Sequence, residues 1–127
     1  MTVPTNLETF VREFYRLSDV PDNQYLDLFH DDLEFHIGER HAYSRADLHE
    51  MRVLGAKAVA NRVHNFDNIY WNDKEPDVVL ATGTIDLDRL ADGIQIRGLP
   101  WMAKIEFRHG KINKYTGYAT FPPVQAK

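Results

Sequence analysis

The feature that most constrains the fold of this chain is the order of its apolar patterns. Helix-like periodicity is confined to the first part, and long strand-like runs fill the second part over 63–71, 78–87, 94–107 and 112–121. Alternating βαβ units would instead space the helices evenly between the strands. This order therefore predicts an α+β domain with a mainly antiparallel sheet.

The first part of the chain predicts three helices and one strand. Apolar residues recur at helical spacing over 7–17, a short second helix is expected over 25–29, and a third is expected over 44–55. Between the second and third helices, the segment 33–37 alternates apolar with polar residues, which is typical of a strand with two different faces.

Length and composition exclude several classes of protein. The 127 residues predict one domain over 1–127 with a loose tail at 121–127, and the net charge of −4 argues against nucleic-acid binding. The absence of cysteine excludes disulfides and thiolate chemistry. No apolar run reaches the ~20 residues of a membrane span. The N-terminus carries no secretory signal pattern, so a cytoplasmic protein without a membrane partner is expected.

Short motifs across the chain resemble the SnoaL-like group of the nuclear-transport-factor-2-like superfamily, over 34–38, 43–45, 79–86, 99–102 and 109–118. Limonene epoxide hydrolases and SnoaL-like polyketide cyclases are the most similar members. The resemblance implies a cone, in which a curved, mixed, mainly antiparallel sheet packs on three N-terminal helices and encloses a pocket. The group also contains steroid isomerases, dehydratases and non-catalytic binding proteins, so the fold leaves the activity open.

The resemblance also implies site residues. Asp86 falls where epoxide hydrolases keep a catalytic aspartate, and His36 falls where they keep an asparagine that holds water. Two positions depart from that pattern, because Thr84 replaces an expected arginine and Gly117 replaces a second aspartate, so the epoxide hydrolase triad is not intact. Tyr15 is placed like the tyrosine with which steroid isomerases donate a hydrogen bond to an oxyanion.

The chemistry of these residues depends on which strand faces line the pocket. Asp86 shares a polar face with Thr82 and Thr84, and desolvation would raise the pKa of its carboxyl if that face lined an apolar cavity. His36 titrates near neutral pH in ordinary surroundings, and Glu34 on the same face could hold one of its ring nitrogens. The alternative for both faces is contact with water, without a catalytic role.

Other residues are expected to bind the substrate. Alternation places His64 on the same face as Phe66 but does not decide whether that face lines the pocket. The expected substrate-binding residues are Glu34, His64, Thr84, Trp101 and Tyr118. No metal site is predicted because the chain lacks His-x-His and His-Glu-x-x-His pairs, and no nucleotide cofactor is predicted because it lacks a glycine-rich phosphate loop.

The sequence predicts a cofactor-free enzyme of secondary metabolism that uses general acid–base catalysis on a small apolar or polycyclic metabolite. Asp86 and His36 would exchange protons, and Tyr15 or Tyr118 would polarise an oxygen during isomerisation, cyclisation or dehydration. The alternatives are an epoxide hydrolase and a non-catalytic small-molecule-binding or adaptor domain. A cavity that holds Asp86 and His36 favours catalysis, whereas an apolar cavity with both outside favours binding. The aromatic residues of the late strands predict a homodimer.

Overall fold

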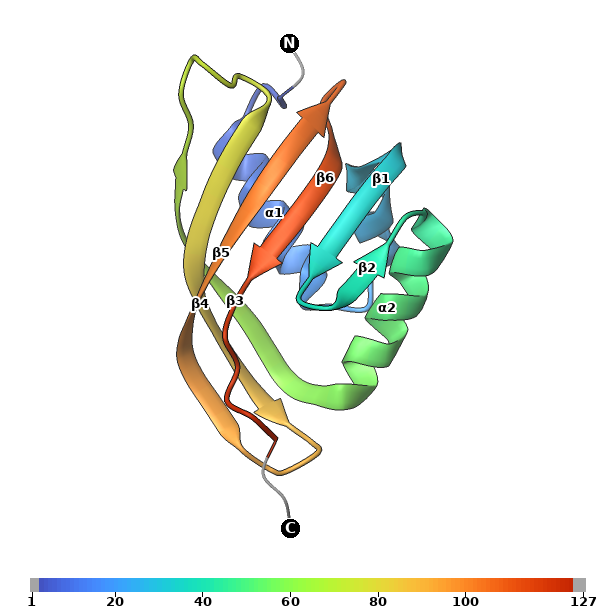
Figure 1. The fold of residues 1–127 in the computed structure, drawn as a ribbon, viewed down its shortest axis with the longest axis vertical. Helices are drawn as coiled ribbons and strands as arrows, with labels where there is room; N and C mark the ends of the chain where they lie inside the picture. Colours follow the sequence, from blue (N-terminus) through green and yellow to red (C-terminus); the bar gives the residue numbers. More distant parts are fainter. Residues whose placement is uncertain (1–2, 125–127) are drawn as a thin grey trace.

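One strongly curved, six-stranded sheet is the framework of the computed structural model, which describes residues 3–124 (Figure 1). The strand order is β2-β1-β6-β5-β4-β3, and neighbouring strands are antiparallel except for β1 and β6, which are parallel. The strands are β1 Phe29–Ile37, β2 Arg40–Ala42, β3 Val59–Tyr70, β4 Val78–Arg89, β5 Gln95–Arg108 and β6 Lys111–Tyr118. The predicted α+β class with a mixed, mainly antiparallel sheet is confirmed.

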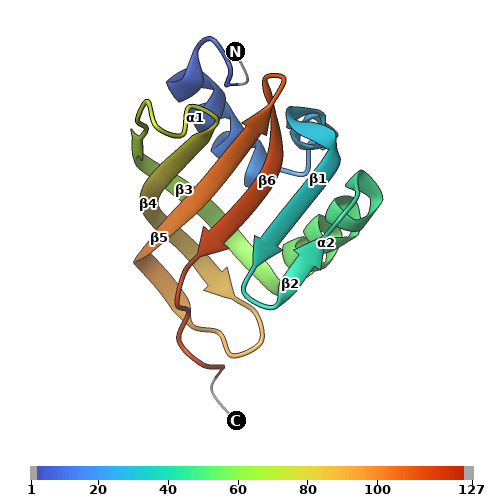
Figure 2. The same ribbon diagram turned by 45° about the horizontal axis from the view of Figure 1, so that its top comes forward.

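Three helical segments pack behind and beside this sheet (Figures 1 and 2). They are α1 Leu7–Ser18, the short 3₁₀ helix η1 Asn23–Leu28 and α2 Arg45–Ala58. The α1 helix lies on the concave side of the sheet, and α2 lies beside β2 and the start of β3. Within residues 3–124, no helix has the length and apolar character needed to cross a bilayer.

The structure extends the predicted elements and adds one. The strand predicted at 33–37 begins earlier, at Phe29, and the strand predicted at 63–71 begins at Val59. The β2 strand was not predicted because its three residues are too few to show alternation. It follows a tight turn at Gly38, whose φ of 58° is in the left-handed region that glycine adopts without strain.

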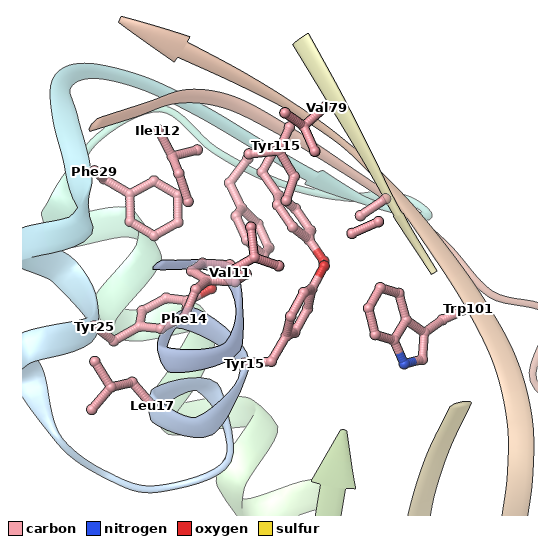
Figure 3. Packing of buried hydrophobic residues seen from close by; sticks show 14 of the residues in the cluster. Val11, Phe14, Tyr15, Leu17, Tyr25, Phe29, Val79, Trp101, Ile112 and Tyr115 are labelled. Carbon is pink, nitrogen blue, oxygen red and sulfur yellow. The ribbon is translucent and has the colours of Figure 1, made fainter. Parts of the chain in front are cut away.

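The core lies between the concave face of the sheet and α1. The buried residues of α1 recur at helical spacing and face the sheet: Leu7, Val11, Phe14, Tyr15 and Leu17. The Phe14 ring contacts those of Tyr25, Phe29 and Tyr115 at centroid distances of 5.1, 5.9 and 5.4 Å (Figure 3). Each large apolar side chain buried in this way stabilises the fold by about 1.5–3 kcal/mol.

Alternation along β4 decides which strand face is inside. The inward residues are apolar or small, namely Val79, Ala81, Gly83, Ile85 and Leu87, and the polar residues between them face outward. The indole of Trp101 covers Gly83, and its Nε1 donates a hydrogen bond to the Thr84 carbonyl at 2.8 Å. A Cβ atom at position 83 would lie 2.6 Å from Trp101 Cζ2 and 2.2 Å from the Asn65 carbonyl oxygen.

The predicted loose tail at 121–127 lies partly outside the described residues, from position 125 onward. In the described part, the Arg89 guanidinium donates hydrogen bonds to the carbonyls of Pro122 and Pro123 at 2.5 and 3.1 Å. The chain therefore runs back against the end of β4 after β6 has ended.

Substituting Gly83 tests this close packing. We expect Gly83→Ala to lower the free energy of unfolding by about 3 kcal/mol, because neither the Asn65 backbone nor the buried indole can move away cheaply. Urea denaturation measures the loss. The matched control is Gly55→Ala in α2, where the nearest atom to the new Cβ is 3.9 Å away and alanine raises helix propensity by up to about 1 kcal/mol. Equal stability of the two variants would contradict the packing described here.

Candidate functional site

Two adjoining cavities lie between the concave face of the sheet and the helices. The inner cavity, of about 90 Å³, reaches the core and is lined mainly by aromatic and apolar residues, with His64 among them. The outer cavity, of about 440 Å³, lies between α2, the segment after α1 and the start of β3, and includes Val20, Val53 and Val59. Arg52 and Arg62 line both cavities and so lie at their boundary.

A histidine held by a carboxylate lies at this boundary. Asp19 immediately follows α1, and its Oδ1 is 2.6 Å from Nδ1 of His64 on β3. Its Oδ2 accepts the main-chain N–H of His64, also at 2.6 Å. Because a carboxylate can only accept, Nδ1 carries a proton, and in the neutral form of the ring Nε2 is then the proton-accepting nitrogen. Within residues 3–124, Nε2 has no hydrogen-bond partner.

Both side chains of this pair are largely shielded from water, with exposed fractions of 18% for His64 and 13% for Asp19. The Arg62 guanidinium lies 3.3 Å from Asp19 Oδ1 and keeps positive charge beside the carboxylate. A neutral imidazole that is oriented through Nδ1–H is a common arrangement for a general base.

Two buried tyrosines face each other beside His64. The hydroxyl oxygens of Tyr15 and Tyr115 are 3.0 Å apart, from α1 and β6 respectively (Figure 3). Burial raises the pKa of Tyr115 to about 12, and burial, followed by the effect of Tyr115, raises the pKa of Tyr15 well above its ordinary value. Both phenols are therefore neutral near pH 7. The pair holds two hydroxyl protons, so one can bridge the oxygens while the other is donated to a ligand.

Trp101 is buried against two of these residues, although it is not among the residues that line the inner cavity. Its ring centroid is 4.4 Å from that of Tyr15 (Figure 3). The distance to the ring centroid of His64 is 5.8 Å. Of the residues predicted from the sequence, the structure therefore brings together Tyr15, His64 and Trp101 on the concave face.

Asp86 lies on the opposite face of the sheet, between the inward-facing Ile85 and Leu87. Its carboxylate accepts hydrogen bonds from the Gly98 main-chain N–H at 2.8 Å and from the Asn65 side-chain amide at 3.3 Å. These two hydrogen bonds, that of Gly98 first, lower the pKa of Asp86 below its ordinary value. The condition under which desolvation would raise this pKa is therefore not met, because the polar face of β4 does not line the cavity.

His36 and Glu34 also face outward, since the residues between and after them on β1, Phe35 and Ile37, line the inner cavity. The His36 ring lies between Nδ1 of His41 at 2.7 Å and the Glu34 carboxylate at 3.8 Å. Asp86 is on β4, and the strands β5 and β6 separate it from β1. The structure does not bring Asp86 and His36 together, and catalysis by these two side chains stays a prediction.

Thr84 and Tyr118 lie on the outer face as well. Thr84 follows the outward alternation of β4, and the Tyr118 side chain is 54% exposed beside Met102. No group of three or more histidine or acidic side chains within residues 3–124 is arranged to hold a metal ion.

The sequence interpretation missed Asp19 and Tyr115. One signal for Asp19 was available in the sequence. A negative charge at the C-terminal end of a helix interacts unfavourably with the helix dipole, which indicates that another contact stabilises this carboxylate. The pairing of Tyr115 with Tyr15 spans 100 positions of sequence, and no local pattern predicts it.

Comparisons with known proteins rest on structure alone, because no family model and no curated protein sequence matches the chain. A hypothetical protein from Catenulispora acidiphila with a ketosteroid isomerase-like fold, solved in complex with trimethylamine, is 14% identical. The alignment covers 97% of this chain and 91% of that chain, with a TM-score of 0.79.

Two further solved structures are similar over most of their lengths. TerC co-crystallised with polyporic acid is 16% identical, with 88% of this chain and 89% of that chain covered and a TM-score of 0.74. A proposed polyketide cyclase from Xanthomonas campestris pv. campestris is 18% identical, with 87% of each chain covered and a TM-score of 0.71. The chain therefore has the ketosteroid isomerase-like, NTF2-like fold that its sequence motifs predicted.

Proposed function

We propose that the chain is an acid–base enzyme that acts on a small, largely apolar molecule whose reacting carbon lies in the inner cavity. The observation that carries this proposal is the 2.6 Å contact between Asp19 Oδ1 and His64 Nδ1, beside a buried pair of neutral tyrosines. His64 is the base, Asp19 positions it, and Tyr15 with Tyr115 donates a hydrogen bond to the substrate oxygen.

The proposed reaction begins at a carbon next to a carbonyl group. His64 Nε2 takes the proton from this carbon, and Asp19 stabilises the imidazolium that forms. The carbonyl oxygen becomes an enolate oxygen, and the tyrosine hydroxyl that donates to it stabilises the developing charge. Return of the proton to another carbon gives isomerisation, and attack of the enolate carbon on a second carbonyl of the substrate gives cyclisation.

The names of similar structures support this class, since they include a ketosteroid isomerase-like fold and a proposed polyketide cyclase. The ligands in their names, trimethylamine and polyporic acid, support a small-molecule pocket.

A binding protein without catalysis is the second candidate, and one observation favours it. Asp86 and His36 both lie outside the cavity, which was the arrangement expected of a binding domain. The cavity is not purely apolar, however, because His64, three tyrosines and three arginines are among the residues that line it. An epoxide hydrolase has less support, since Asp86 faces away from the cavity and positions 84 and 117 lack the matching residues.

Proton exchange tests the proposed base without knowledge of the natural substrate. We expect the wild-type protein to catalyse incorporation of solvent deuterium next to the carbonyl of 2-tetralone, followed by NMR. We expect His64→Gln to reduce this rate by about a hundred- to ten-thousand-fold, because the proton acceptor is lost. Asp19→Asn should reduce the exchange rate less than His64→Gln, since this substitution removes only the charge that positions His64.

The matched controls are Asp86→Asn and His36→Gln, which make the same chemical changes on the outer face. The asparagine keeps an oxygen that can accept from Gly98, and we expect both variants to exchange at the wild-type rate. If these two controls lost exchange while His64→Gln kept the wild-type rate, the chemistry would lie on the outer face instead. Binding of 2-tetralone without any exchange would favour the binding protein.

The tyrosine pair separates catalysis from stability. Tyr15→Phe leaves the buried Tyr115 hydroxyl unpaired, so we expect a loss of about 1–3 kcal/mol in the free energy of unfolding. The double variant Tyr15→Phe/Tyr115→Phe removes both hydroxyls and should recover most of this stability. Its exchange rate should stay about a hundredfold or more below wild type because no oxyanion donor remains. Recovery of activity together with stability would show that the pair is only structural.

We further propose that the outer face of the sheet forms a homodimer interface. Exposed apolar side chains gather on this face from neighbouring strands: Val63, Tyr70, Leu80, Met102 and Tyr118. An apolar patch that crosses several strands is typical of a protein–protein contact, and a twofold contact needs only this one surface.

Sedimentation velocity tests the dimer. We expect the wild type to sediment as a dimer at micromolar concentration and Met102→Glu to shift it toward monomer, because the charge would be buried at the interface. Leu90→Glu is the control, since Leu90 is also exposed but lies at the turn between β4 and β5. A monomeric wild type would contradict the proposal.

A further inference from the structure

Two arginines lie at the boundary between the cavities, Arg52 from α2 and Arg62 from β3. No side chain fills the space beside them at Gly55, where a Cβ atom would meet Arg62 Nη1 at 3.9 Å as its nearest neighbour. Any molecule that extends from the outer to the inner cavity passes these two guanidinium groups.

One edge of each guanidinium is already occupied by the end of α1. Arg52 Nη2 donates to the Val20 carbonyl at 2.7 Å, and Arg62 Nη2 donates to the Ser18 carbonyl. The Arg52 guanidinium also lies over the Tyr25 ring, 3.9 Å from its centroid. These contacts hold the two guanidinium groups in place, so part of the role of each arginine is structural.

One remaining donor of this pair is not explained by the fold. Arg52 Nη1 is buried and has no hydrogen-bond partner among residues 3–124. Arg62 Nε is also buried without a hydrogen bond, although Asp19 lies at the ion-pair distance of 3.3 Å. Buried donors are almost always paired in folded proteins, so Arg52 Nη1 indicates a partner that binds from outside the chain.

The charge balance of the cavities points to an anion. Among the described residues that line them, the cationic side chains are Arg40, Arg52, Lys57 and Arg62, and the only carboxylate is that of Asp19. Asp19 already binds His64. The chain as a whole has a net charge of −4, so this excess of positive charge is local to the cavities. Burial lowers the pKa of Arg52, Tyr25 partly offsets this, and the charge of Arg62 lowers the pKa further; a bound anion would counteract the lowering.

We propose that the substrate of this site carries a carboxylate, which Arg52 and Arg62 bind at the boundary of the two cavities. This inference rests on the proposed acid–base function and names the substrate class. The planar fork of a guanidinium matches a carboxylate with two parallel hydrogen bonds. The reacting carbon then lies in the inner cavity near His64, and the rest of an apolar skeleton occupies the outer cavity beside Val20, Val53 and Val59.

A pair of isosteric probes tests this on the unmodified protein. We compare 1-naphthoate with 1-naphthamide, which has the same shape but no charge, by calorimetry at low salt and by NMR of the arginine Nε–Hε groups. We expect the carboxylate to bind at least about tenfold more tightly, because charge-assisted hydrogen bonds are the stronger ones. We also expect the Arg52 and Arg62 signals to shift when it binds.

Substitutions then assign the effect to the two arginines. We expect Arg52→Gln and Arg62→Gln each to remove most of the preference for the carboxylate, with urea denaturation used to confirm that the variants are folded. The control is Arg16→Gln, because Arg16 is an exposed arginine of α1 whose ion pair with Glu13 lies away from both cavity linings. It should retain the wild-type preference.

Equal affinity for the two probes, no binding of either, or shifts confined to exposed arginines would overturn the inference. The exchange assay uses 2-tetralone, which is a neutral ketone, so it tests the proposed catalysis separately from the inferred carboxylate site. Exchange without a carboxylate preference would overturn only the anion site. A carboxylate preference without exchange would overturn only the proposed catalysis.

Discussion

The packing of α1 on the concave face of the sheet holds both the core and the candidate site in place. Val11, Phe14 and Leu17 are buried on one side of this helix and fix its position against the strands. The same helix presents Tyr15 to the inner cavity, and Asp19 follows its last residue. A shift of α1 would therefore alter the core and the His64 contact together, so the stability of the protein and the geometry of its site are coupled.

The fold class could be predicted because it depends on patterns that are local in sequence. Helical periodicity before long alternating runs was enough to disfavour an all-parallel sheet and to predict a mainly antiparallel one. The parallel pairing of β1 with β6 needs contact between Phe35 and Tyr115, and no pattern within either strand indicates it. The three-residue β2 was missed because it carries too little alternation to be recognised.

The candidate site was predicted less well, and the reason is physical. Alternation shows that Ile85 and Asp86 point to opposite sides of a strand. Which of these two sides faces the core is decided by tertiary packing. In a sheet covered on one side only, the apolar set faces the helices, so the cavity lies on that side as well. The polar set of β4 is consequently outside. The histidine that does line the cavity depends on Asp19, which is 45 positions away in the sequence.

The surface carboxylate of Asp86 has a consequence for the shape of the sheet. It lies at a register irregularity between Ile85 and Leu87, and its two hydrogen-bond donors belong to the strands on either side, Asn65 on β3 and Gly98 on β5. Such irregularities bend a sheet, and Gly98 has the positive φ of 64° that a bend tolerates. These two hydrogen bonds favour the ionised form of Asp86, so the pKa of its carboxyl is lower in the folded than in the unfolded chain. Their contribution to stability is therefore complete above the ordinary pKa of an aspartate, and it is lost as the pH falls through the lower pKa of the folded state. The ionised carboxylate on the outer face thus joins β4 to both of its neighbouring strands at the one point where the pairing of β4 with β5 is irregular.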